Sequence, residues 1–153
     1  MNSVAIVDTS VLCELLAVPG KSGVVDQTRK QLEEKSRAGE RLFLPLAAVF
    51  ETGNHIGQVA DGTVRRKCAE LLAKLVIDAL DQNSPFVPMQ LPEPGQIRAW
   101  VDEFPAWVGT KSGLGDLSIK HDWERLCRLH RGRRVYIWSL DVHLSSFDRA
   151  PEV

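Results

Sequence analysis

The feature that most constrains the fold is a regular alternation of short apolar runs with helical stretches. Residues 3–7 (SVAIV), 41–44 and 135–139 read as short strands, and the first is suited to burial on both faces. Strands separated by helices need crossover connections, which produce a mostly parallel sheet covered on both faces. The sequence therefore predicts an α/β fold, a three-layer α/β/α sandwich with a central, mostly parallel sheet, as a single domain over residues 1–153.

The helices between these strands are predicted from apolar spacing and from breakers. The strongest amphipathic pattern runs from Cys68 to Leu80, and we expect it to form core scaffold. Pro45 suits the first position of a helix. The remainder after the last strand reads as a tail or an edge strand. Helices are predicted near 9–16, 22–38, 45–60, 68–80, 95–103 and 116–131, with a loop over 104–115 and an irregular or edge strand near 86–91.

Composition indicates a soluble protein of the cytoplasm. The longest apolar stretch, counting Pro45, has nine residues, 42–50, against about 20 for a membrane span. The N-terminal stretch has no basic leader, so we expect no signal peptide. Cys13, Cys68 and Cys127 lie in apolar helical patterns, which suits buried thiols better than disulfides or a zinc site. The net charge of −1 gives no global attraction to nucleic acid, although residues 111–134 carry seven basic and three acidic residues.

Four acidic residues come from four separate segments, each near a predicted strand end or helix start. Asp8 directly follows the first strand, and Asp141 follows the last one by a single residue. Asp116 begins the helix after a glycine-rich loop, and Glu51 lies in the helix after the second strand. Ligands of such folds gather at the carboxyl ends of the strands. We therefore expect the four carboxylates to converge at one edge of the sheet.

Each of these acids also has an ordinary structural explanation. Asp8 before Thr9 is suited to a helix N-cap, and an acid at position 116 is favoured by the dipole of its helix. Glu51 is compatible with a solvated helix face, and Asp141 with a turn. Taken singly, the structural interpretation is favoured for every one. The coincidence of all four at expected strand ends or helix starts favours a site.

Four ordered motifs span nearly the whole chain and resemble a known family. They are Val7–Ser10 (VDTS), Glu51–Asn54 (ETGN), Gly113–Ile119 (GLGDLSI) and Ser139–Leu144 (SLDVHL). This set resembles the PIN domain of the VapC type, the ribonuclease toxin of bacterial and archaeal toxin–antitoxin pairs. The resemblance implies a divalent metal at the acidic cluster, endonucleolytic cleavage of RNA, frequent homodimers and an antitoxin that blocks the site. Leu144, where the family commonly has an aromatic residue, and the proline-rich stretch 86–95 depart from the pattern.

The chemistry of the four acids agrees with this resemblance. Carboxylates packed together raise one another's pKa values and cost stability unless cations neutralise them. Oxygen ligands suit Mg²⁺ or Mn²⁺, and no Cys/His cluster has the spacing of a zinc site. Such an ion activates water for attack on a phosphodiester. We expect Asp8 and Asp116 to be the primary ligands, with Asp141 and Glu51 completing the first or second shell of a catalytic set of four.

Several further residues are predicted to support the site or contact RNA. The hydroxyl of Ser10 or Ser139 could orient a carboxylate or a water, and Asn54 could hold a ligand or touch substrate. Lys111 and Lys120 lie nearest to Asp116 in the basic segment and are predicted to contact phosphates. Trp107 is suited either to stacking on an unpaired base or to anchoring its loop.

Several other functions need residues or motifs that this sequence lacks. No dinucleotide-binding or P-loop motif is present, and Ser10 stands where a haloacid-dehalogenase phosphatase needs a second Asp. The chain also lacks the acidic pair at the end of the first strand and the Lys after a late strand that a phospho-receiver domain needs. The main alternative is a catalytically inactive PIN-like module that binds RNA or a protein partner. A nuclease that acts on DNA is a further alternative within the same fold.

Overall fold

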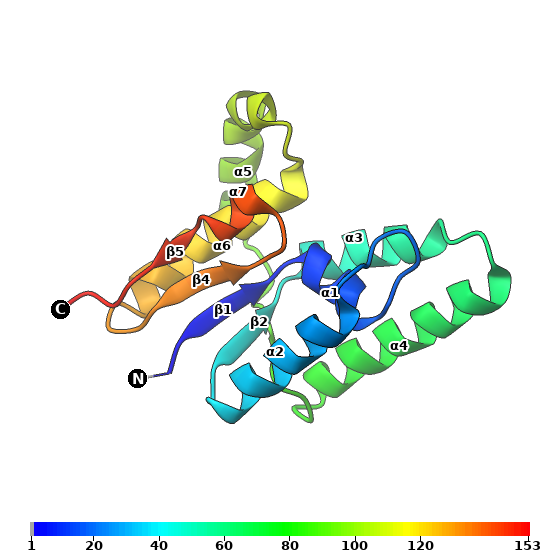
Figure 1. The fold of residues 1–153 in the computed structure, drawn as a ribbon. Coiled ribbons are helices and arrows are strands. Elements are labelled where there is room, and N and C mark those ends of the chain that lie inside the picture. The colour runs from blue at the N-terminus through cyan, green and yellow to red at the C-terminus, as the bar shows by residue number, and fades with distance from the viewer. Residues whose placement is uncertain (1) are drawn as a thin grey trace.

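The computed structural model describes residues 2–153, and a five-stranded sheet forms its centre (Figure 1). The strands lie in the order β3-β2-β1-β4-β5. All neighbouring strands pair in parallel except β4 and β5, which are antiparallel. The strands are β1 (Val4–Val7), β2 (Arg41–Leu44), β3 (Phe86–Pro88), β4 (Val135–Trp138) and β5 (Asp148–Arg149).

Helices cover both faces of this sheet, as the sequence predicted. In Figure 1, α2 lies in front of the sheet and α6 lies behind it. Because two helical layers enclose one mostly parallel sheet, the predicted three-layer α/β/α sandwich is confirmed. The helices are α1 (Thr9–Leu15), α2 (Val25–Arg37), α3 (Leu46–Gly57), α4 (Gly62–Leu80), α5 (Pro94–Trp107), α6 (Leu114–Leu129) and α7 (Val142–Ser145), with a 3₁₀ turn η1 (Val108–Thr110).

The core lies around the two central strands. Every residue of β1 is fully buried, and every residue of β4 is buried. Central strands of a covered parallel sheet are packed on both faces, which explains why their sequences are continuously apolar instead of alternating. Leu12 of α1, Ile119 of α6 and Leu144 of α7 complete the same cluster. The core therefore fixes the elements that carry the acidic residues.

The strand order creates a switch point between β1 and β4. From β1 the chain moves to β2 and then β3, and it returns through α5 and α6 to β4 on the other side of β1. Ligands of open α/β sheets bind where the strand order reverses, beyond the carboxyl ends of the strands. In Figure 1 these ends of β1 and β4 point toward α1 and α7. Asp8 and Asp141 immediately precede these two helices as their N-caps.

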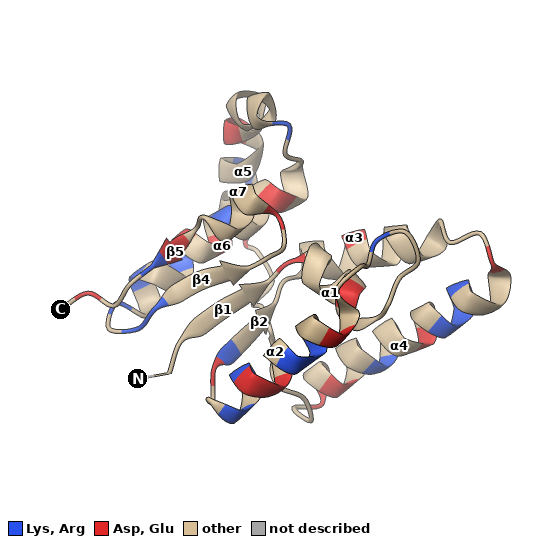
Figure 2. Cartoon of the chain, in the orientation of Figure 1, with Lys and Arg blue, Asp and Glu red and all other residues tan. Residues whose placement is uncertain are grey.

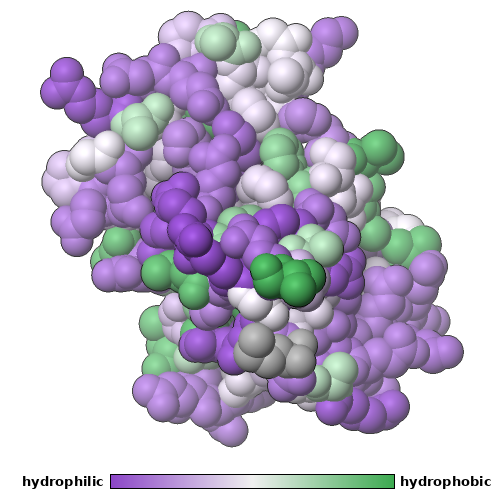
Figure 3. Space-filling model, turned by 90° about the vertical axis from the view of Figure 1, so that its left-hand side faces the viewer, coloured by the Kyte–Doolittle hydropathy of each residue, from purple (hydrophilic) through white to green (hydrophobic). Residues whose placement is uncertain are grey.

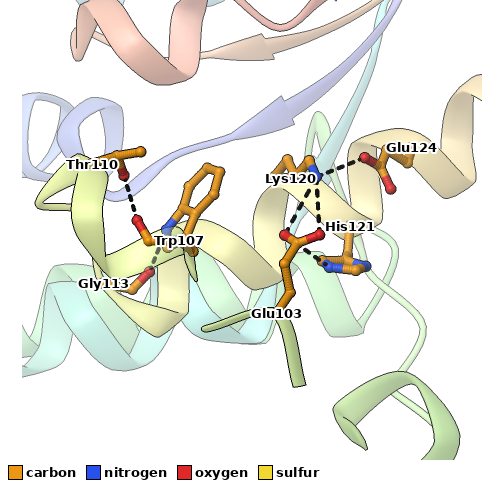
Figure 4. A network of polar contacts seen from close by, with 7 residues as sticks. All are labelled: Glu103, Trp107, Thr110, Gly113, Lys120, His121 and Glu124. Atoms are coloured by element: carbon orange, nitrogen blue, oxygen red, sulfur yellow. Dashed lines mark hydrogen bonds and ion pairs between the residues drawn. The ribbon is translucent and has the colours of Figure 1, made fainter. Parts of the chain in front are cut away.

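The predicted loop over 104–115 is wrong for most of its length. Helix α5 continues through Pro105 to Trp107, η1 follows, and α6 begins at Leu114. The indole of Trp107 explains the order of this segment. Its Nε1 donates to the carbonyl of Gly113 at 3.2 Å, and Thr110 Oγ1 donates to the carbonyl of Trp107 at 2.8 Å (Figure 4). Trp107 is buried, so it anchors the turn that leads into α6.

The expectation that the Cys68–Leu80 helix forms core scaffold holds for part of its apolar face, because Cys68, Ala79 and the partly buried Leu72, Leu75 and Val76 pack in the core. Of the residues of α4, only Cys68 and Ala79 are buried, whereas Ile77 is 54% and Leu80 is 63% exposed. Part of α4 stays exposed because the helix packs against α3 and the edge strand β3 and not across the face of the sheet.

The start of α3 differs from the prediction by one residue, since Pro45 is the N-cap of α3 and not its first residue.

The face of the molecule at the amino ends of the strands is mainly hydrophilic (Figure 3). Its hydrophobic atoms form separate spots and no continuous area. None of the helices within residues 2–153 is long and apolar enough to cross a membrane.

Candidate active site

Asp8 is the most buried of the four predicted acids. Its residue is only 4% exposed, and its backbone N–H donates to the carbonyl of Trp138 at 3.0 Å, which ties it to β4. The carboxylate oxygen Oδ2 accepts from the Ser10 and Ser139 hydroxyls, both at 2.8 Å, and from Ser10 N at 3.4 Å. All hydrogen bonds to this side chain from residues 2–153 reach Oδ2. Oδ1 is therefore left without a protein donor in that part of the chain.

Two serines join Asp8 to the segment that carries Asp141. Ser10 Oγ accepts from the backbone N–H of Leu140 at 3.0 Å. Ser139 Oγ accepts from the backbone N–H of Asp141 at 2.9 Å. Each hydroxyl thus donates to Asp8 and accepts from the β4–α7 connection. The Asp141 carboxylate is exposed and caps α7 by accepting from the N–H groups of His143 and Leu144.

Glu51 reaches the same region from α3. Its Oε2 accepts from Thr9 Oγ1 at 3.1 Å, which links α3 to the first residue of α1. Its Oε1 lies 3.8 Å from His55 Nε2, one helical turn further along. A Cβ added to Gly115 would lie 3.7 Å from Glu51 Oε2, so the first turn of α6 passes directly beside this carboxylate.

Asp116 shows that the four carboxylates affect one another. The pKa of Asp116 is raised to about 6, first by burial and then by the negative charges of Asp8, Glu51 and Asp141. Figure 2 shows the corresponding acidic segments at the end of β1, in α3, at the start of α6 and just before α7. Burial and neighbouring like charges both favour the neutral form of a carboxyl group. The other three carboxylates therefore lie close enough to Asp116 to raise its pKa, as the expected convergence requires.

The donor set of this cluster fits a hard divalent cation in kind. Carboxylate and hydroxyl oxygens are the ligands that Mg²⁺ and Mn²⁺ prefer. Within residues 2–153, however, no group of three or more His, Cys, Asp or Glu side chains is arranged closely enough to hold an ion. Each of Asp8, Glu51 and Asp141 turns an oxygen to hydroxyl or N–H donors. The predicted ligands Asp8, Asp116 and Asp141 thus share one region without forming a ready coordination shell.

The structure places the predicted substrate-binding residues differently from one another. Ser10 lies inside the cluster, where it holds Asp8. Asn54 is exposed on α3, and no side-chain hydrogen bond within residues 2–153 involves it. Lys111 is exposed, has a left-handed backbone with φ of 62°, and ends η1 just before α6. These contacts with RNA stay predictions.

Lys120 is engaged by carboxylates of its own chain (Figure 4). Its Nζ lies 3.0 Å from Glu124 and 3.4 Å from Glu103, and its side chain is only 19% exposed. Glu103 also lies 3.5 Å from His121. To contact a phosphate, Lys120 would have to leave two glutamates. The other basic residues of its segment lie mainly at the far end of α6, toward the start of β4 (Figure 2).

The contacts of Thr9 and His55 were not predicted. Thr9 follows Asp8 directly, and its hydroxyl binds a carboxylate 42 positions away. His55 stands at the i, i+4 spacing from Glu51 that places two side chains on one helix face. Trp107 was predicted either to stack on an unpaired base or to anchor its loop. It is buried, and its ring centroid lies 5.2 Å from that of His143 on α7. Only its loop-anchor interpretation agrees with this burial.

The fold and site together define a class: a three-layer α/β protein with coupled carboxylates at its switch point. Comparisons of the chain with protein-family models, with curated proteins and with solved structures gave no match.

Proposed function

We propose that the protein is a metal-dependent endoribonuclease that hydrolyses phosphodiester bonds of RNA. The proposal is carried by one observation, the raised pKa of Asp116 beside the charges of Asp8, Glu51 and Asp141. Like charges held together at a switch point cost stability, and a bound cation offsets that cost. A structural role for each acid alone does not explain why four segments bring them together.

The chain's own residues divide the work of such a site. Asp8 and Asp116 would hold Mg²⁺ or Mn²⁺, with Asp141 and Glu51 completing the first or second shell. When bound, the ion supplies an activated water and stabilises the charge on the leaving oxygen. Ser10 and Ser139 fix the orientation of Asp8, and Thr9 fixes Glu51. These hydroxyls keep the carboxylates in place before any ion arrives, which lowers the cost of ordering the site.

Cleavage of a labelled single-stranded RNA of mixed sequence tests the proposal. We expect wild-type protein to cut in Mg²⁺ or Mn²⁺ and to stop in excess chelator. Asp8→Asn and Asp116→Asn should each lose at least a hundredfold in rate, whereas Asp26→Asn should keep it, because Asp26 is an exposed residue in the first turn of α2. An Asp116→Asn protein that cuts at the wild-type rate would remove the assignment.

We extend the proposal to a cytoplasmic toxin of a toxin–antitoxin pair, with an antitoxin as partner and a homodimer as the working form. This part is supported by the motif resemblance alone. Induced expression of the wild type in a bacterial host should arrest growth, and expression of Asp116→Asn should not. Light scattering of the purified protein measures the oligomeric state. Normal growth with abundant active enzyme would remove the toxin role and leave the nuclease.

A second candidate function is a PIN-like module without catalysis that binds RNA or a protein. It is favoured by the absence, within residues 2–153, of three acids arranged to hold an ion. This candidate predicts that RNA binds equally well with and without divalent cations and stays intact. The cleavage experiment therefore separates the two functions.

A further inference from the structure

A cavity of about 180 Å³ lies next to the acidic cluster, between α3, α6, α5 and the segment after β3. Two of its lining residues connect it to the site. Ala47 lies 3.9 Å from where a Cβ on Gly115 would stand, beside Glu51. Ser118 donates its hydroxyl to the carbonyl of Gly115 at 2.6 Å. The cavity thus begins one helical turn from Glu51 along α3 and two residues from Asp116 along α6.

The lining of this cavity combines aromatic faces with a few polar groups. Phe50 is 64% exposed although it is a large apolar residue, and Trp100 forms another part of the wall. Gln90, Ser118 and Asp122 supply polar atoms. Exposed rings beside hydrogen-bonding groups are what single-stranded nucleic acid uses for stacking and for reading base edges. The volume is below the roughly 300–1,000 Å³ of pockets for drug-sized ligands, which limits an occupant to about one ring system.

Basic side chains lie on the side of this cavity that is away from the four acids. A second cavity of about 220 Å³ shares Trp100 and Asp122 with the first and is also lined by His121, Arg125 and Arg128. Arg125 donates to Gln90 Oε1 at 3.4 Å and to Asp122 Oδ1 at 3.5 Å, which ties the two cavities together. At 1.5 Å per residue, Arg125 and Arg128 lie about 14 and 18 Å along α6 from Asp116. A chain of phosphates beyond the cluster would meet these guanidinium groups.

We propose that the cavity beside Phe50 and Trp100 binds one unpaired base of the RNA next to the scissile phosphate. The base stacks on Phe50, Ser118 and Asp122 present polar atoms to its edge, and Arg128 contacts a phosphate further along the strand. This subsite would contribute to the choice of cleavage position. It rests on the proposed function in naming RNA as the ligand, but it does not require that the protein cut RNA.

The test measures binding without cleavage. The probe is a single-stranded heptamer of uridine with one central 2-aminopurine, added in chelator, where stacking of the analogue on an aromatic ring quenches its fluorescence. We expect Phe50→Ala to bind about 5- to 100-fold more weakly and to lose the quenching, as alanine substitution at a stacking ring does. Phe50→Trp should restore both. Leu80→Ala is the matched control, because Leu80 is 63% exposed on α4, outside both cavities beside the site.

Two further measurements give each outcome a meaning. The same heptamer paired to its complement should show no further quenching when the protein is added, and Arg128→Ala should flatten the salt dependence of binding by about one unit of slope. If Phe50→Ala binds and quenches like the wild type, the base subsite is wrong, whether or not the protein cuts RNA. If Phe50→Ala instead changes only the oligomeric state, the cavity belongs to a protein interface and the proposal is overturned. Cleavage lost in Asp116→Asn with quenching intact keeps both proposals.

Discussion

The charged side chains at the two ends of the sheet have opposite surroundings. At the end where β4 begins, the Arg134 guanidinium makes two hydrogen bonds to Asp148, at 2.9 and 2.7 Å. Arg149 donates to four backbone carbonyls in the last turn of α6 and just beyond it. At the other end, Asp8, Glu51 and Asp141 meet hydroxyls, N–H groups and one imidazole, and their charges act on Asp116. At the first end Arg134 and Arg149 are matched by acceptors, whereas the second end gathers charges of one sign.

The pKa values show the consequence of this difference. The pKa of Asp148 is lowered by its hydrogen bond and its attraction to Arg134. The pKa of Asp116 is raised to about 6 by burial and by three neighbouring carboxylates. A lowered pKa of an acid stabilises the folded state at neutral pH, and a raised one destabilises it. Perturbed acids of the second kind are typical of functional sites, because folding alone gives no reason to keep them.

The largest effect is expected at the end of the sheet where β4 begins. Arg149→Met should lower the free energy of unfolding by about 2–4 kcal/mol, because several partly buried carbonyls lose charged donors. The donors now serve the carbonyls of Cys127, His130 and Arg133 at 2.7–2.8 Å and of Arg131 at 3.2 Å. Urea unfolding measures the change, and Arg98→Met is the control, because Arg98 is exposed in an ion pair of 4.0 Å. A loss below about 0.5 kcal/mol in Arg149→Met would contradict this account.

Addition of Mn²⁺ should give the next largest effect, and only at the acidic end. A cation that binds the folded protein stabilises it by about 2.7 kcal/mol at 100 times its Kd. We expect thermal unfolding of the wild type to shift upward with Mn²⁺ and that of Asp8→Asn/Asp116→Asn to stay in place. Asp122→Asn is the matched control, because Asp122 lies on the same helix with its pKa also raised to about 6 by burial. Equal shifts in the wild type and the double variant would favour the binding module.

Asp116→Asn without metal should stabilise the protein at neutral pH by about 1 kcal/mol, a value discounted for solvent screening. The folded pKa of about 6 lies above the ordinary aspartate value of 3.8, so the folded state binds the proton more tightly. The penalty on the wild type is therefore absent below about pH 4, grows as pH rises toward 6 and is constant above that. Asp148→Asn should show the opposite sign at pH 7. Unfolding at pH 4 and 7 measures both variants, and a gain of equal size at the two pH values would exclude titration of Asp116 as its cause.

The fold and the positions of the acids were open to prediction because both depend on local patterns. The apolar run of residues 4–7 identifies a central strand, and Asp8 follows it directly. The partners of the acids were not open to prediction in the same way. Thr9 meets Glu51 only because α1 and α3 pack with a particular rotation, and apolar spacing does not specify rotation to within one side chain.

The segment after residue 103 shows how one local error affects the interpretation of a site. Its proline and glycines predicted a loop, so Glu103 was not expected beside Lys120, and Lys120 was predicted to contact phosphates because it lies near Asp116 in the sequence. In the structure α5 extends to Trp107 and brings Glu103 to within 3.4 Å of Lys120. The anchoring hydrogen bond from Trp107 to Gly113 joins two residues of the turn and has no periodic signal in the sequence. Cations therefore need their tertiary partners before a role in binding is assigned.

The smallest effect separates the two lysines nearest to Asp116. Lys111→Gln should flatten the salt dependence of RNA binding by about one unit of slope, because Lys111 is exposed and free to release counterions on contact with phosphate. Lys120→Gln should change the slope by much less, because Glu103 and Glu124 already compensate its charge. Binding of a single-stranded RNA in chelator at several salt concentrations measures both slopes. If Lys120→Gln flattened the slope as much as Lys111→Gln, Lys120 would have to break its ion pairs with Glu103 and Glu124 when RNA binds. The two lysines would then contribute equally to the contact with phosphates.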